Sequence, residues 1–175
     1  MAAILEKVYK KPFQELIKEE IIAKAQLKNT FFHLKIQDQK RLANGYNESG
    51  ILMPHLSLEK TLWGGEGALK STIPDLLKYA QFQLDDRNQM AKEAHKSIRE
   101  LDTNYWIGYF WWIIGVKGKN LHFRHDGGAA GTRNVLLIYP ESGIGISVMT
   151  NVVGPQIFNN LSKLGKGIYN DLKKQ

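Results

Sequence analysis

The stretch that decides the fold runs from His122 to Asn151 and reads HFRHDGGAAGTRNVLLIYPESGIGISVMTN. It contains two continuous apolar runs of strand length, Val135–Tyr139 and Ile144–Met149. Pro140-Glu-Ser-Gly143 separates them and has the composition of a turn. Two such runs joined by a short turn predict an antiparallel β-hairpin.

A glycine-rich segment, His125-Asp-Gly-Gly-Ala-Ala-Gly131, leads into this hairpin. A residue without a Cβ atom lets another group approach the backbone closely. His125 and Gly127 fall on the same face of a strand because side chains alternate. The histidine could therefore place a hydrogen-bond donor at a cleft, while the glycine lets a ligand lie against the strand. A strand end that simply twists through glycines is the plainer alternative.

The composition is that of a globular protein of one domain or a large part of one. The 175 residues are 43% hydrophobic and 23% charged. The net charge of +7 comes from lysines spread along helical stretches, without a nucleic-acid-binding motif, so we expect a solvated basic surface and no nucleic-acid partner. The absence of cysteine excludes disulfides, a thiolate nucleophile and cysteine-ligated zinc. The first residues lack the pattern of a signal peptide, and no apolar run is long enough to span a membrane. These features do not decide the cellular compartment.

Helical and strand periodicities alternate along the rest of the chain. Residues 33–67 show no sustained period and are expected to form a long surface excursion. Helices are predicted near Ile4–Val8, over Phe13–Ala23, over Thr72–Leu84, over Asn88–Leu101 and after Gly154-Pro155. Thr72 and Asp75 form a capping box at the start of the third helix, and the fourth is expected to be exposed. The strands are predicted over Tyr105–Ile114, Leu121–Asp126 and the hairpin.

Two short patterns suggest chemistry but carry little weight. His122 and His125 are three residues apart on a strand and so face opposite sides, which argues against a shared metal ion. Ser57-Leu-Glu-Lys60 matches S-x-x-K, in which a helix places a lysine beside a nucleophilic serine. Its flanks leave room only for a short helix, and we interpret it as a chance match. No metal and no cofactor is expected.

Several stretches in the same order resemble the serine β-lactamase and penicillin-binding-protein superfamily, in its class C-like branch. His125-Asp-Gly127 is similar to the [KH]-x-G signature of that superfamily's active-site strand, and the similarity continues through Gly131, Tyr139-Pro-Glu141 and Gly143 to Thr150-Asn151. The stretch from Gly67 to Leu76 resembles its glycine-then-Ser-Thr helix start. Further similar pieces are Phe13–Thr30, Asn44-Gly-Tyr46 and Tyr109-Phe-Trp-Trp112.

The resemblance implies an α+β fold with an antiparallel sheet flanked by helices, a partial β-lactamase/transpeptidase-like domain. It assigns residues 1–175 to the C-terminal portion of one such domain. In that family the S-x-x-K helix with the nucleophile and the Tyr-x-Asn loop come earlier in the chain, so we expect both upstream of Met1. Full-length relatives are mostly exported proteins.

Site roles follow from the same resemblance. Gly128 would donate its N–H to the oxyanion hole, and His125 would provide a donor or a positive charge facing nucleophile and substrate. Gly127 would let the substrate lie against the strand, and Asn151 would contact the substrate at the cleft edge.

The implied function is acyl transfer or hydrolysis of a β-lactam, D-Ala peptide or ester, with this chain inactive alone because the nucleophile is missing. The alternatives are a non-catalytic binding or interaction module and a truncated gene product. The expected partners are a small-molecule or peptide substrate in the complete domain and an N-terminal half. Without the family's first strands, Ile144–Met149 would be an unpaired apolar edge, which also predicts self-association.

Overall fold

A computed structural model describes residues 1–57 and 65–174. Its centre is a six-stranded antiparallel sheet in the order β3-β4-β5-β6-β7-β8, and a small β1-β2 pair lies apart from it. The strands are β1 (Gly45–Tyr46), β2 (Leu52–Met53), β3 (Arg99–Asp102), β4 (Tyr105–Ile107), β5 (Trp112–Ile114), β6 (His122–Ala129), β7 (Thr132–Tyr139) and β8 (Ile144–Thr150).

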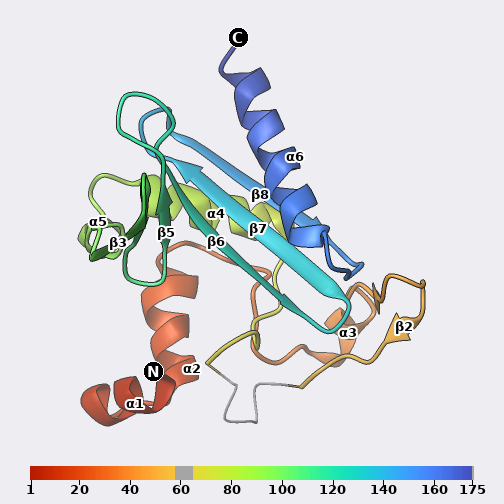
Figure 1. Cartoon of the computed structure of the whole chain (residues 1–175). Helices are drawn as coiled ribbons and strands as arrows, with labels where there is room; N and C mark the ends of the chain where they lie inside the picture. The colour runs from red at the N-terminus through yellow and green to blue at the C-terminus, as the bar shows by residue number, and fades with distance from the viewer. Residues whose placement is uncertain (58–64, 175) are drawn as a thin grey trace.

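Helices cover both faces of this sheet. Figure 1 shows α6 along one face of β7 and β8, with α4 behind the other face. The helical elements are α1 (Ala2–Tyr9), α2 (Phe13–Ile17), which continues as a π-helical segment η1 (Lys18–Ala23), α3 (Ile36–Gln39), α4 (Ile73–Leu84), α5 (Gln89–Ala94) and α6 (Ile157–Leu172). The predicted α+β class and the antiparallel sheet flanked by helices are confirmed.

Alternation along β7 divides the core into two layers. One face of β7 and β8 packs under α6, through Val135, Leu137, Tyr139, Ile146, Val148, Leu161 and Tyr169. Leu136 and Ile138 point the other way, toward Ala80 of α4 and toward Trp111, Ile113 and Phe123. Both faces of β7 are buried, which is why its sequence is a continuous apolar run rather than an alternating one.

The predicted hairpin is confirmed over its whole length. β7 and β8 pair without interruption from Tyr139↔Ile144 to Arg133↔Thr150. Among the described residues, β8 pairs with no other strand of this sheet, so it forms the predicted edge.

The expected exposed helix over Asn88–Leu101 is wrong in its second half. The Asn88 side chain caps α5 by accepting from Ala91 N, but the helix ends at Ala94. Arg99–Asp102 instead forms strand β3 against β4. All four residues of β3 are exposed, so their sequence carries no alternation that would mark a strand.

The expected single strand over Tyr105–Ile114 folds back on itself as β4 and β5. The chain turns at Gly108, where a Cβ atom would lie 2.7 Å from the Ala94 carbonyl oxygen. Phe110 completes the turn with a left-handed φ of 64°.

The Thr72–Asp75 capping box is half confirmed. The Thr72 hydroxyl accepts from Asp75 N at 3.4 Å, as expected of an N-cap. The Asp75 carboxylate, however, turns away and accepts from Asn29 N at 2.6 Å and from Thr30 Oγ1 at 2.9 Å. It therefore ties α4 to the end of the first helical unit.

Candidate active site

The outer edge of β6 is open over the predicted site. β6 pairs with β7 as far as Ala129, but β5 pairs only with its first three residues, His122 to Arg124. From His125 to Ala129 the strand therefore has a neighbour on one side only, among the residues that the structure describes. Backbone groups that point to this side can bind a ligand.

The backbone of Gly128 points to this open side. The loop between β6 and β7 has two residues, so the flanking pair Ala129↔Thr132 is hydrogen-bonded. Hydrogen-bonded and non-hydrogen-bonded pairs alternate along an antiparallel ladder. Gly128, opposite Arg133, is thus in a non-hydrogen-bonded pair, and its N–H and C=O face away from β7.

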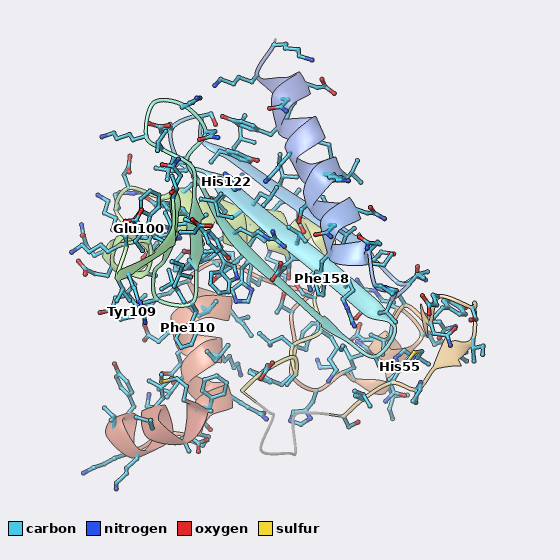
Figure 2. All side chains as sticks on the ribbon, viewed as in Figure 1. His55, Glu100, Tyr109, Phe110, His122 and Phe158 are labelled. Atoms are coloured by element: carbon cyan, nitrogen blue, oxygen red, sulfur yellow. The ribbon has the colours of Figure 1, made fainter. Side chains whose placement is uncertain are left out.

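A Cβ atom has no room at Gly128. It would lie 2.5 Å from Cδ of Arg133 and 2.5 Å from the Thr132 carbonyl oxygen. The Arg133 guanidinium folds back over this position, donates to the carbonyl oxygens of Ala129 (2.9 Å) and Thr132 (2.8 Å), and lies 5.4 Å from the Phe158 ring centroid. Figure 2 marks Phe158 on α6, beside the end of the sheet where β6 turns into β7.

Arg133 is a site residue that the sequence motifs did not predict. Its position directly across a two-residue hairpin from Gly128 is the signal that could have found it, because opposed residues share a face.

Gly127 and His125 share the opposite face, as predicted. An added Cβ at Gly127 would meet no atom within 4 Å, so this face of the strand is open to a ligand. The His125 ring stands edge-on to Trp111, with 5.9 Å between centroids. His125 keeps an exposed surface, and its partial burial beside Trp111 lowers the pKa of the imidazole, an effect that the neighbouring Asp126 partly opposes. A lowered pKa favours the neutral imidazole, which can donate or accept a hydrogen bond.

An apolar hollow of about 430 Å³ adjoins His125. Aromatic and aliphatic side chains from η1, α4, α5 and the β4–β5 turn line most of it, among them Tyr79, Phe82, Tyr109 and Phe110. Figure 2 labels Tyr109 and Phe110 at the end of the sheet that faces α2. The run from Tyr105 to Ile114 was expected only as a strand, so this hollow was not predicted from the sequence.

Asp126, the middle residue of the H-x-G segment, faces away from the hollow. It forms an ion pair with Arg124, two residues earlier on the same face of β6. Its charge is thus neutralised within the strand.

Asn151 lies at the same end of the sheet as Gly128. Gly128 lies opposite Arg133, and Arg133 lies opposite Thr150, the residue before Asn151. Asn151 is therefore about two strand spacings, roughly 10 Å, from Gly128. The side-chain amide of Asn151 donates to the backbone carbonyl oxygen of Asn44 at 3.0 Å. The backbone carbonyl oxygen of Asn151 accepts from Tyr46 N at 2.8 Å. These bonds hold the β1 segment against the end of β8.

His122 does not join His125 at the site. His122 faces α6, stacks on Tyr139 at 5.1 Å between centroids and bonds through Nδ1 to the Asn120 carbonyl. In the part of the chain that the structure describes, no three acidic or histidine side chains gather into a metal site. Of the S-x-x-K pattern, residues 58–60 lie outside the described residues. None of the described helices is long and apolar enough to cross a membrane.

The chain is similar to known proteins in sequence and in fold. The model of the Beta-lactamase family matches residues 1–164. A β-lactamase from Sulfitobacter sp. EE-36 superimposes with a TM-score of 0.82 at 14% identity, over 99% of this chain and 57% of that one. A penicillin-binding protein homologue from Pyrococcus abyssi, described as octameric, gives 0.68 at 22% identity, over 86% of this chain and 36% of that one. No curated protein matches.

This chain belongs to the beta-lactamase family. It has the class C-like form of the fold: a class C β-lactamase superimposes with a TM-score of 0.74 at 15% identity, over 88% of this chain and 50% of that one. The chain thus spans about a third to just over half the length of these solved structures.

Proposed function

We propose that this chain forms the oxyanion-side wall of a serine-hydrolase site whose nucleophilic serine comes from another polypeptide segment. The reaction would be acyl transfer from a β-lactam, a D-Ala peptide or a small ester. The observation that carries the proposal is the position of Gly128, whose N–H points out from the open edge of an H-x-G strand.

Gly128 would stabilise charge that develops during the reaction. When a serine oxygen adds to the carbonyl carbon, the π electrons move to the carbonyl oxygen, which becomes an oxyanion. A backbone N–H held in place beside this oxygen is worth about 10²- to 10³-fold in rate. Collapse of the adduct breaks the bond to the leaving group, which takes up the proton that the serine hydroxyl lost and departs as an amine or alcohol. The acyl-serine that remains is then hydrolysed by water.

His125 and Gly127 would orient the substrate on the neighbouring face. Because burial lowers the pKa of His125, the neutral ring would donate a hydrogen bond rather than supply a positive charge. The open space at Gly127 would admit the substrate backbone beside the strand. Asn151, whose amide already bonds to Asn44, would contact substrate only if that bond were exchanged.

The hollow beside His125 would receive the apolar side of the segment that carries the serine. Its lining is mostly aromatic and aliphatic, and burying such a surface against a partner is favourable by about 25 cal/mol per Å². Docking there would bring the new segment next to His125 and toward the open edge of β6.

The test is co-expression of this chain with the polypeptide encoded immediately upstream, followed by assays with nitrocefin and p-nitrophenyl esters. We expect hydrolysis by the complex and a loss of about 10²- to 10³-fold when the amide between Gly127 and Gly128 is replaced by an ester, which removes the outward N–H without adding a Cβ atom or breaking a bond to β7. Circular dichroism would verify that the ester variant is folded. Full activity of the folded ester variant would contradict the proposal.

A non-catalytic binding module is the second candidate, favoured by the open edge of β6 and the space at Gly127. In that case benzylpenicillin or a D-Ala-D-Ala peptide would shift the amide resonances of Gly127 and Gly128 without any turnover. Unchanged amide resonances at saturating ligand would exclude it.

A further inference from the structure

The turn between β6 and β7 packs backbone against backbone on Gly45 of β1. At Gly45 an added Cβ atom would lie 2.7 Å from Cα of Gly131 and 2.9 Å from the Ala130 carbonyl oxygen. At Gly131 an added Cβ atom would lie 2.4 Å from Cα of Gly45. Both glycines are buried, and neither side of the contact has room for a side chain. Figure 1 shows this end of the sheet beside α3 and β2, the neighbours of β1 in the chain.

This turn is not of a type that fits a hairpin by itself. Of its two residues, Ala130 and Gly131, only Gly131 has a left-handed φ, at 72°. A type I′ turn has positive φ at both positions, and a type II′ turn has it at the first. Positive φ at the second position alone is the pattern of type II, whose twist splays the flanking strands. The contact with Gly45 therefore supports a turn that needs support.

Residues 44–46 are in turn bonded to the chain that leaves β8. Tyr46 N donates to the Asn151 carbonyl oxygen at 2.8 Å, and Val153 N donates to the Tyr46 carbonyl oxygen at 3.0 Å. The Asn151 side-chain amide donates to the Asn44 carbonyl oxygen at 3.0 Å. The backbone bonds hold Tyr46, and the amide bond holds the residue on the other side of Gly45. Gly45 is thus fixed through both of its neighbours.

The position of the turn affects the direction of the Gly128 N–H. Gly128 is in a pair without hydrogen bonds to β7, and only the Ala129↔Thr132 pair lies between it and the turn. Arg133 covers Gly128 and donates to the carbonyl oxygens of both residues of that pair. The end of the hairpin is therefore held by Arg133 from within and by Gly45 from outside.

We propose that Asn151 is a positioning residue for the Gly128 N–H, on which it acts through residues 44–46 and the β6–β7 turn. The inference rests on the proposed function, because that function gives the direction of this N–H its importance. A donor in an oxyanion hole is effective when it is already in place as the charge develops. Asn151 needs no contact with substrate for this role, since its amide stays on the Asn44 carbonyl oxygen.

The first test uses the chain by itself and measures backbone amide order parameters by nuclear magnetic resonance. We expect values near about 0.85 for Gly128 and Gly131 in the unmodified chain, and lower values with shifted amide resonances in Asn151→Ala. Asn170→Ala, at an exposed asparagine on α6, is the matched control and should change neither residue. Unchanged order parameters and resonances in folded Asn151→Ala would overturn the proposal, whatever the activity of the complex.

A variant on the other side of the contact tests the route. Gly45→Ala places a methyl group against the Gly131 backbone and leaves the Asn151 side chain intact. It should disturb the same amides, and combining it with Asn151→Ala should add little, because both variants act through one contact. Circular dichroism would verify that each variant is folded. Fully additive effects would mean that Asn151 acts by another route, which would overturn the proposal.

The second test uses the complex described under the proposed function, with one substrate that has a carboxylate and one that lacks it. Nitrocefin has a carboxylate, and p-nitrophenyl acetate does not. We expect Asn151→Ala to lower kcat and kcat/KM about tenfold, equally for both substrates, because the N–H is misplaced in the transition state. A loss confined to nitrocefin would identify Asn151 as a contact of the substrate carboxylate and would overturn the proposal. If the unmodified complex hydrolyses neither substrate, the proposed function fails, and the order parameters decide whether Asn151 holds the turn.

Discussion

Asp75 is the buried carboxylate on which the first helical unit depends. It has no exposed surface and accepts hydrogen bonds from Asn29 N and Thr30 Oγ1. Nζ of Lys78 lies 3.5 Å from its Oδ1. Removing it would leave the Asn29 N–H without this acceptor and the Thr30 hydroxyl with only Ser71 Oγ as a partner.

We predict that Asp75→Ala lowers the free energy of unfolding by about 2–4 kcal/mol, measured by urea denaturation. The exposed Asp86→Ala is the control and should stay within about 0.5 kcal/mol of the unmodified chain. Equal stability of the two variants would show that the Asp75 bonds contribute nothing.

His95 gives the protein a pH dependence of stability. Its ring stacks on Phe123 with centroids 4.0 Å apart, and burial lowers its pKa from 6.5 to about 4. Between these values the unfolded chain binds the proton and the folded chain does not, so protonation favours unfolding as the pH falls. Burial lowers the pKa of His122 and His125 in the same direction.

We therefore predict that the free energy of unfolding decreases as the pH is lowered from about 6.5 to about 4. His95→Phe should flatten this profile, and the exposed His55→Gln should leave it unchanged. An unaltered slope in His95→Phe would contradict the assignment.

At the scale of elements, close contact between a strand and a helix depends on glycine. At Gly145 of β8 an added Cβ would lie 2.6 Å from Cβ of Ala80, so α4 would have to move. At Gly167 of α6 an added Cβ meets nothing within 4 Å, and alanine is the better helix former by about 1 kcal/mol.

We predict opposite effects for the same substitution at these two glycines. Gly145→Ala should destabilise the fold by about 1–3 kcal/mol, and Gly167→Ala should stabilise it by up to about 1 kcal/mol. Thermal unfolding at low protein concentration measures both, free of any contribution from association. A neutral Gly145→Ala would mean that α4 does not pack closely on β8.

The elements that could be predicted from sequence are those whose own residues show burial. The β7–β8 hairpin is apolar with a turn between, and α4 and α6 repeat apolar residues at helical spacing. β3 could not be predicted, since all its residues are exposed and only its pairing with β4 makes it a strand. The turn at Gly108 was also missed, because its cause is the distant Ala94 carbonyl.

The same distinction holds for the candidate site. His125, Gly127 and Gly128 could be chosen from a short motif and the alternation of a strand. Arg133 over Gly128, and the hollow formed by η1, α4, α5 and the β4–β5 turn, depend on contacts between segments far apart in the chain. Periodicity within one segment does not contain that information.

At the scale of the whole molecule, the fold is part of a beta-lactamase-family domain. Among the described residues, the outer edge of β6 and the hollow beside His125 are open to a partner. In the proposed function both belong to the chemistry.

The most direct measurement is covalent labelling of the purified chain by fluorescent penicillin, read by intact-mass spectrometry. We expect no adduct and no nitrocefin turnover, because in the proposed function this chain supplies the oxyanion wall and another polypeptide segment supplies the nucleophile. A penicilloyl adduct on Ser57, lost in Ser57→Ala, would contradict it and make the S-x-x-K segment the active centre.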